Sequence, residues 1–104
     1  WRPIAWCSFI TGKYDQAQNY YKKILAEKPE AQDYLNAGHT EWALRNLHAA
    51  VSDYAEAARN CGDGYPEFEK LFLQDLPELK AAGIHENDVQ LMLDSVSFSL
   101  SGTL

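Results

Sequence analysis

The sequence predicts an all-α fold built from stacked antiparallel helical hairpins, and three observations support this prediction. Apolar residues recur with helical spacing, as in Tyr14, Ala17, Tyr21 and Ile24. Strand-like alternation is absent, and good helix formers such as Ala, Leu, Glu, Lys and Gln dominate the chain. The same residue types also return after 33 positions, and repeats of about this length are typical of helical hairpins.

Six helices are expected, and glycine, proline and asparagine mark the ends of the first three. Gly12 ends the first helix, because glycine adopts the left-handed conformation of a helix end at little cost. Pro29 stops the second helix, since proline cannot continue the backbone hydrogen-bond ladder, and Asn46 separates the third helix from the fourth. The expected ranges are 2–11, 14–27, 31–44, 47–60, 65–82 and 86–99.

The second half of the chain contains one clear loop and one interrupted helix. The stretch CGDGYP, residues 61–66, is the loop. Asp75, Pro77 and Glu78 then have the pattern of an N-cap, a first-turn proline and an acidic third position. We therefore expect the fifth helix to be kinked or split near Pro77, and Gly83 to close it.

The internal repeat relates the first two hairpins to each other. A single hairpin cannot cover its own apolar face, so a second copy stacks on it. The equivalent positions include small residues, which let paired helices approach closely, and large rings, which fill the space between hairpins. Three of these equivalent pairs are Ala5 and Gly38, Ala17 and Ala50, and Tyr21 and Tyr54.

We expect two parts, with two hairpins over residues 1–62 and a divergent helical pair over residues 63–104 that caps the array. One apolar stripe of the last helix comprises Val89, Met92, Leu93, Val96 and Leu100. Leu91 and Phe98 lie outside this stripe, so the helix is apolar on more than one side. Either it packs on the fifth helix and a neighbouring repeat, or Leu91 and Phe98 form a dimer face or the seat of a missing segment.

Charge argues against two classes of partner. The net charge is −6, and the whole excess lies in residues 62–104, which hold two basic and eight acidic side chains. Without a basic patch, the chain is a poor candidate for binding nucleic acid or anionic membranes. No apolar run approaches the ~20 residues that span a bilayer. Because the sequence opens on Trp1 rather than Met, we expect a piece of a longer protein; its compartment is unknown, with the cytoplasm favoured.

Motifs in the two predicted hairpins identify a family resemblance. The first unit reads Trp1-x2-Ile4-Ala5, then Gly12-x-Tyr14-x2-Ala17-x3-Tyr21-x2-Ile24, then Pro29. The second unit reads Tyr34-x2-Ala37-Gly38, then Leu47-x2-Ala50-x3-Tyr54-x2-Ala57. This pattern resembles the tetratricopeptide repeat, a pair of antiparallel helices in about 34 residues. Ser8 and Glu41 depart from the family's Tyr, and the second unit lacks the final Pro.

The resemblance implies a concave groove lined by the first helix of each hairpin. The candidate peptide-binding residues are Arg2, Trp6, Phe9, Leu35, His39 and Trp42. Family members that bind the acidic C-termini of heat-shock chaperones use Lys, Asn and Arg in this groove, and here only Arg2 fits. An aromatic and apolar groove instead suits a hydrophobic peptide or helix. Packing of Trp6, Phe9 and Trp42 between helices is the alternative interpretation.

No constellation for chemistry occurs in the sequence. None of His39, His48 and His85 forms a recognised metal-binding pair, and no phosphate-binding glycine loop is present. Two cysteines, Cys7 and Cys61, do not make a disulfide framework. A pair of Cys7 and His39 is conceivable, but nothing in the sequence would orient it. We therefore expect no enzyme, no metal and no cofactor.

The sequence favours a non-enzymatic scaffold for protein–protein interaction, with a protein or peptide partner. The alternative is a structural C-terminal end of a longer helical-repeat protein, or a dimerisation piece, with no ligand of its own. Upstream repeats of the same chain or a second copy would then cover the exposed faces.

Overall fold

The computed structural model describes residues 1–102 and is all-helical over that range, without strands. The expected helices are present close to their expected limits, and the fifth is split at Asp75 into two helices, as the Asp-Leu-Pro-Glu pattern predicts. The helices are α1 (Arg2–Ile10), α2 (Tyr14–Leu25), α3 (Ala31–Ala43), α4 (Leu47–Asn60), α5 (Tyr65–Gln74), α6 (Leu76–Ala81) and α7 (Asn87–Ser101).

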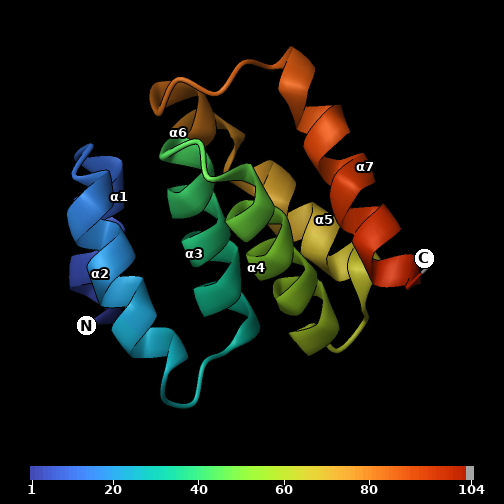
Figure 1. The fold of residues 1–104 in the computed structure, drawn as a ribbon, viewed down its shortest axis with the longest axis horizontal. Coiled ribbons are helices and arrows are strands. Elements are labelled where there is room, and N and C mark those ends of the chain that lie inside the picture. The colour runs from blue at the N-terminus through green and yellow to red at the C-terminus, as the bar shows by residue number, and fades with distance from the viewer. Residues whose placement is uncertain (103–104) are drawn as a thin grey trace.

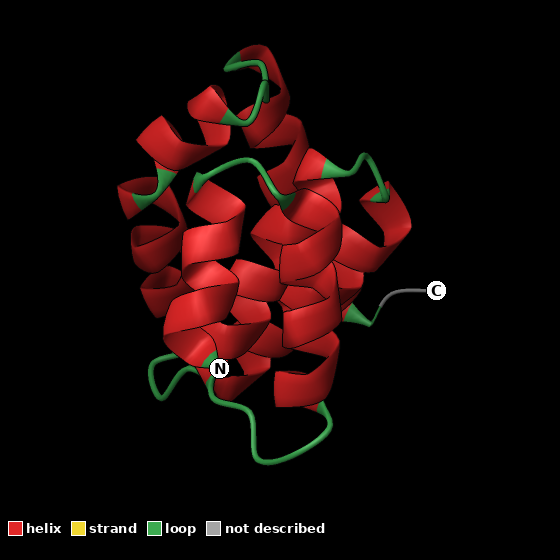
Figure 2. Ribbon diagram, turned by 90° about the vertical axis from the view of Figure 1, so that its left-hand side faces the viewer, coloured by secondary structure: helices red, strands yellow, loops and turns green. Residues whose placement is uncertain are grey.

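Helices α1 to α4 follow one another across the molecule and α7 lies beyond α4, whereas α6 lies above α3 (Figure 1). The most extensive contacts join α3 to α4 and α1 to α2, and α2 also packs on α3. At the far end α7 lies along α4, while α5 lies behind α4 and α6 is at the top (Figure 1). Figure 2 looks onto the opposite end, which α1 and α2 form. The first and last helices therefore make the two ends of the molecule.

Positions that the repeat makes equivalent are buried alike in the two hairpins. Ala17 and Ala50 have no exposed surface, and the rings of Tyr21 and Tyr54 are both buried. A Cβ atom added at Gly38 would lie 2.6 Å from the ring of Tyr54, so only glycine permits this close approach. These positions confirm that the small and aromatic residues of the repeat serve packing between helices.

The core consists of two clusters. One joins α1, α2 and one face of α3, through Ala5, Phe9, Ala17, Tyr21, Ile24 and Ala37. The larger one joins α3 and α4 to the C-terminal helices, and its aromatic centre contains Trp42, Tyr54, Phe68 and Phe72. The C-terminal helices thus share one core with the second hairpin.

Candidate interaction surfaces

The side chains expected in a concave groove are mostly part of the core. Phe9, Leu35, His39 and Trp42 are all buried. The ring of Phe72, from α5, lies 6.2 Å from that of Trp42 and 5.7 Å from that of His39. The prediction that these four residues line an open groove is therefore wrong, since they lie in the interior. Phe72 of α5 packs against His39 and Trp42, and Phe9 packs in the cluster of α1, α2 and α3.

Arg2 and Trp6, the other two groove candidates, are engaged in local contacts. The Arg2 guanidinium donates two hydrogen bonds to the Asp33 carboxylate, at 2.7 and 2.8 Å, and joins α1 to the start of α3. Burial alone would raise the pKa of Asp33, but Arg2 and the Glu30 backbone N–H outweigh it, so this pKa is lowered. The half-buried Trp6 ring stacks on Phe9 at 5.3 Å.

A buried polar network connects the C-terminal helices to the second hairpin. His39 Nδ1 lies 2.7 Å from the Tyr54 hydroxyl, and Nε2 lies 2.9 Å from the Asp75 carboxylate. A carboxylate only accepts, so His39 Nε2 donates to Asp75. Burial raises the pKa of Tyr54 well above its ordinary value, so the hydroxyl remains a donor. With its ring fully buried and both nitrogens bonded, His39 has a structural role here.

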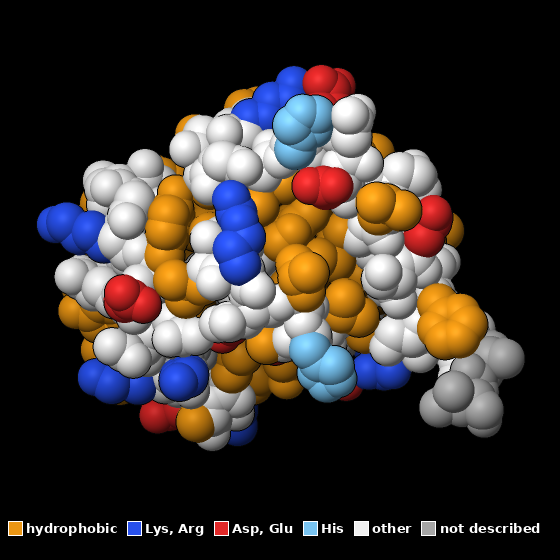
Figure 3. Space-filling view, turned by 45° about the horizontal axis from the view of Figure 1, so that its top comes forward, with side chains coloured by type: hydrophobic (Ala, Val, Ile, Leu, Met, Phe, Trp, Pro, Cys, Tyr) orange, Lys and Arg blue, Asp and Glu red, His pale blue; other side chains and the backbone are white. Residues whose placement is uncertain are grey.

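An open apolar groove, the α4–α7 groove, runs between α4 and α7 and consists of two adjoining hollows. The first has a volume of about 350 Å³. Its apolar lining includes Leu47, Val51, Ile84, Leu91 and Met92. The second hollow shares Leu47 and Val51 and extends along α4 to Ala55 and across to Ser99. In Figure 3, hydrophobic side chains gather over the middle of the face that carries this groove.

Two large side chains at the rim of the α4–α7 groove are exposed to solvent. Leu47 is 54% exposed and Leu91 is 65% exposed. Leu91 was expected to lie outside the buried stripe of its helix, and it does. Leu47 was not singled out from the sequence, because the repeat aligns it with the half-buried Tyr14. The exposure of Leu47 depends on where α7 lies. In the sequence, only the two-sided apolarity of α7 indicated a surface at this place.

The charged side chains that line the α4–α7 groove are mainly basic. Arg45 donates to the backbone oxygens of Trp42 and Gly83, at 3.0 and 3.1 Å, and thereby holds the end of α3 to the segment before α7. Arg59 lines the second hollow and pairs with Glu56 at 2.6 Å. Asp88 is the acidic residue in the lining of the first hollow. This groove therefore combines apolar walls with guanidinium groups in an otherwise acidic protein.

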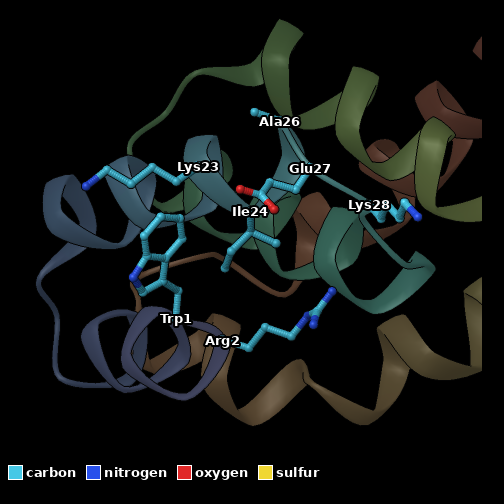
Figure 4. Close-up of a pocket in the computed structure, with 7 residues that line it drawn as sticks. All are labelled: Trp1, Arg2, Lys23, Ile24, Ala26, Glu27 and Lys28. Atoms are coloured by element: carbon cyan, nitrogen blue, oxygen red, sulfur yellow. The ribbon is translucent and has the colours of Figure 1, made fainter.

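A second apolar surface lies at the opposite end of the molecule. Trp1, Ile4 and Ile10 are exposed there, on or next to α1. Beside them, a hollow of about 680 Å³ contains Trp1, Arg2, Lys23 and Lys28 (Figure 4). The Lys23 ammonium lies 5.4 Å from the centre of the Trp1 ring, within reach of a cation–π interaction.

Residues 1–102 contain no cluster of metal-ligating side chains and no helix long and apolar enough to cross a membrane. Both cysteines are free; Cys7 is exposed and Cys61 is buried. In the same range, no hydrogen bond joins Cys7 to His39, whose two ring nitrogens are bonded to other residues. The candidate functional sites are therefore the exposed apolar surfaces described above.

These features define a class, an all-helical protein with open apolar faces on three of its helices. Comparison of the chain with protein-family models, curated proteins and solved structures finds no match. The function is therefore argued from the surfaces themselves.

Proposed function

We propose that this chain is a non-enzymatic protein–protein interaction module of the tetratricopeptide type, which holds an apolar segment of a partner in the α4–α7 groove. The exposure of Leu47 and Leu91 on either side of this groove carries the proposal. Leaving large side chains in water next to an apolar hollow costs solvation free energy, which a partner recovers on binding.

A helical segment suits the shape of this surface best. Two neighbouring helices leave a hollow between them, and an amphipathic helix fits such a hollow with residues spaced by three, four and seven positions. Arg45 and Arg59 are placed along it to meet carboxylates on the polar side of the segment. The proposed partner segment is therefore apolar on one face and acidic at its edges.

The surroundings of Cys7 and His39 support the non-enzymatic part of the proposal. Activated nucleophiles need a base within hydrogen-bond reach. Cys7 has no bond to His39, and the His39 ring is sealed between Tyr54 and Asp75 in the core. The proposed module therefore acts by binding alone.

Fluorescence anisotropy with a labelled amphipathic peptide of about four helical turns tests the proposal. The probe carries leucines at helical spacing on one face and glutamates at its edges, and a scrambled peptide of equal composition is the reference. We expect Leu47→Asp with Leu91→Asp to weaken binding of the probe at least tenfold, because charges enter the apolar rim. Leu73→Asp is the matched control, since Leu73 is also exposed but lies outside the groove. Equal binding by all three proteins would contradict the proposal, and so would failure of the unchanged protein to prefer the probe to the scrambled peptide.

A further inference from the structure

We infer that copies of this chain associate head to tail, with the outer face of α1 in one copy packed on the outer face of α7 in the next. This inference goes beyond the proposed function, because it joins two faces at opposite ends of the molecule (Figure 1). The α7 face adjoins the α4–α7 groove and shares Leu91 with it. It rests on an uncovered helix face at each end, on the internal repeat and on the distribution of charge.

The outer face of α1 is apolar and uncovered. Trp1, Ile4 and Cys7 follow one another at every third position, and all three are exposed. Ile10 is also exposed, but it lies toward α6 and lines a hollow with Glu78 and Ala81. Ile4 is 48% exposed and Ile10 is 53% exposed, while Phe9 on the other side of the helix is buried. A helix that is apolar on both sides is normally buried on both sides.

The repeat shows what covers the same face one hairpin later. Ile4 and Ile10 correspond to Ala37 and Ala43 on α3 when the two units are aligned. Ala37 is buried in the cluster that α1 and α2 form, and Ala43 packs against it. On α3 this face is thus covered by the preceding hairpin, and on α1 the equivalent face is open. A helix laid along α1 would continue an interface that the molecule already contains.

The outer face of α7 supplies such a helix. Leu91 and Phe98 are one heptad apart and project away from the buried stripe that contains Met92 and Val96. Leu91 is 65% exposed and Phe98 is 62% exposed. In the chain of stacked helices α7 is the last, so its free face is turned toward the next copy.

Charge favours contact between unlike ends. Residues 1–30 contain five basic and three acidic side chains, a net charge of +2. Residues 86–101, which include α7, contain three acidic side chains and no basic one, a net charge of −3. Three basic side chains, Arg2, Lys23 and Lys28, and one acidic side chain, Glu27, line the hollow beside α1 (Figure 4). An acidic end is therefore attracted there and a second basic end is repelled.

A contact between two different faces has a defined consequence for assembly. Each added copy leaves one free α1 face and one free α7 face, so the assembly grows with concentration unless a ring closes. Salt screens the attraction between the ends and weakens the association. A dimer made by two identical faces would instead stop at two copies.

Complementation between two end-blocked variants tests the inference by sedimentation velocity. Ile4→Glu blocks the α1 face and keeps the α7 face, whereas Phe98→Glu does the reverse. We expect the unchanged protein to form species that grow with concentration, and each variant alone to be at least tenfold weaker in association. An equimolar mixture of the two variants should form a one-to-one dimer, because one intact α1 face meets one intact α7 face.

A folding check and replacement variants exclude loss of structure as the cause of weaker association. Circular dichroism checks that the variants are folded, and the milder changes Ile4→Ser and Phe98→Ser replace either one that is not. A sedimentation coefficient of the monomer at all concentrations would overturn the inference. So would loss of association in Phe98→Glu alone, with a dimer retained by Ile4→Glu, since that pattern indicates α7 packed on α7. Leu91 belongs to both the α7 face and the groove rim, whereas Ile4 and Phe98 lie outside the groove lining, so the variants Ile4→Glu and Phe98→Glu keep this test separate from the peptide-binding test.

Discussion

Asp53, on α4, is a carboxyl group whose surroundings disfavour its charge. It is half-buried, and burial together with the nearby Glu41 and Glu56 raises its pKa to about 7. The unfolded chain releases this proton near the ordinary value of 3.8. The folded state therefore binds more protons between about pH 4 and pH 7, and stability falls as the pH rises through this window.

Replacement of Asp53 by Asn should therefore stabilise the protein at pH 8. The gain has an upper limit of about 4 kcal/mol from the pKa difference and is expected nearer ~2 kcal/mol, because the side chain is partly solvated. At pH 4 the carboxyl group is largely neutral in the folded state, and the gain should vanish. Urea unfolding at both pH values measures this difference. The same gain at pH 4 and pH 8 would show that the charge of Asp53 is not its cause.

Arg45 is the non-glycine residue with a left-handed backbone within residues 1–102, at φ +67°. It stands where the first hairpin has Gly12, at φ +83°, so both turns require the same conformation. An L-residue with a Cβ is destabilised there by about 1–2 kcal/mol. Arg45→Gly should unfold at a higher temperature than Arg45→Ala, because both lose the hydrogen bonds to Trp42 and Gly83 but only alanine retains the strain. Differential scanning calorimetry measures the unfolding temperatures of the two variants. An unfolding temperature of Arg45→Ala equal to or above that of Arg45→Gly would refute this explanation.

At the scale of elements, the hydrogen bond between His39 and Asp75 links α3 to the junction of α5 and α6. Asp75→Ala leaves the buried Nε2 of His39 without its partner, at a cost of about 1–3 kcal/mol. Asp75→Asn is the matched control, since its amide oxygen still accepts. We expect Asp75→Ala to accelerate hydrogen exchange in α5, α6 and α7 more than it does in α1 and α2. Equal acceleration in all helices would show that the bond stabilises the whole fold rather than this junction.

Helices were predictable from the sequence because their signals are local. The apolar spacing of α2 and the break at Asp75 each depend on residues within one or two turns. The position of α5 was not predictable, because it depends on contacts between distant parts of the sequence, such as Trp42 with Phe72. Of the candidate site, the two-sided apolarity of α7 was visible, whereas the burial of His39 required knowing that Phe72 of α5 packs against it.

At the scale of the whole molecule, the packing of the helices buries some apolar faces and leaves others open. Helix α3 is covered by the first hairpin on one side and by α4 on the other. Helices α1 and α7, at the two ends, each keep an exposed apolar face. A further apolar surface, between α4 and α7, forms the groove. We propose that the molecule binds its partners through these exposed apolar faces.

Methyl NMR spectroscopy with the amphipathic, acidic-edged peptide tests this claim most directly. Methyl groups of Leu47, Val51, Leu91 and Met92 line the α4–α7 groove, and those of Ile4 lie at the far end of the molecule. We expect the peptide to shift the four groove signals at concentrations that leave Ile4 unchanged. Shifts at Ile4 without shifts in the groove, or no shifts at millimolar peptide, would contradict the claim.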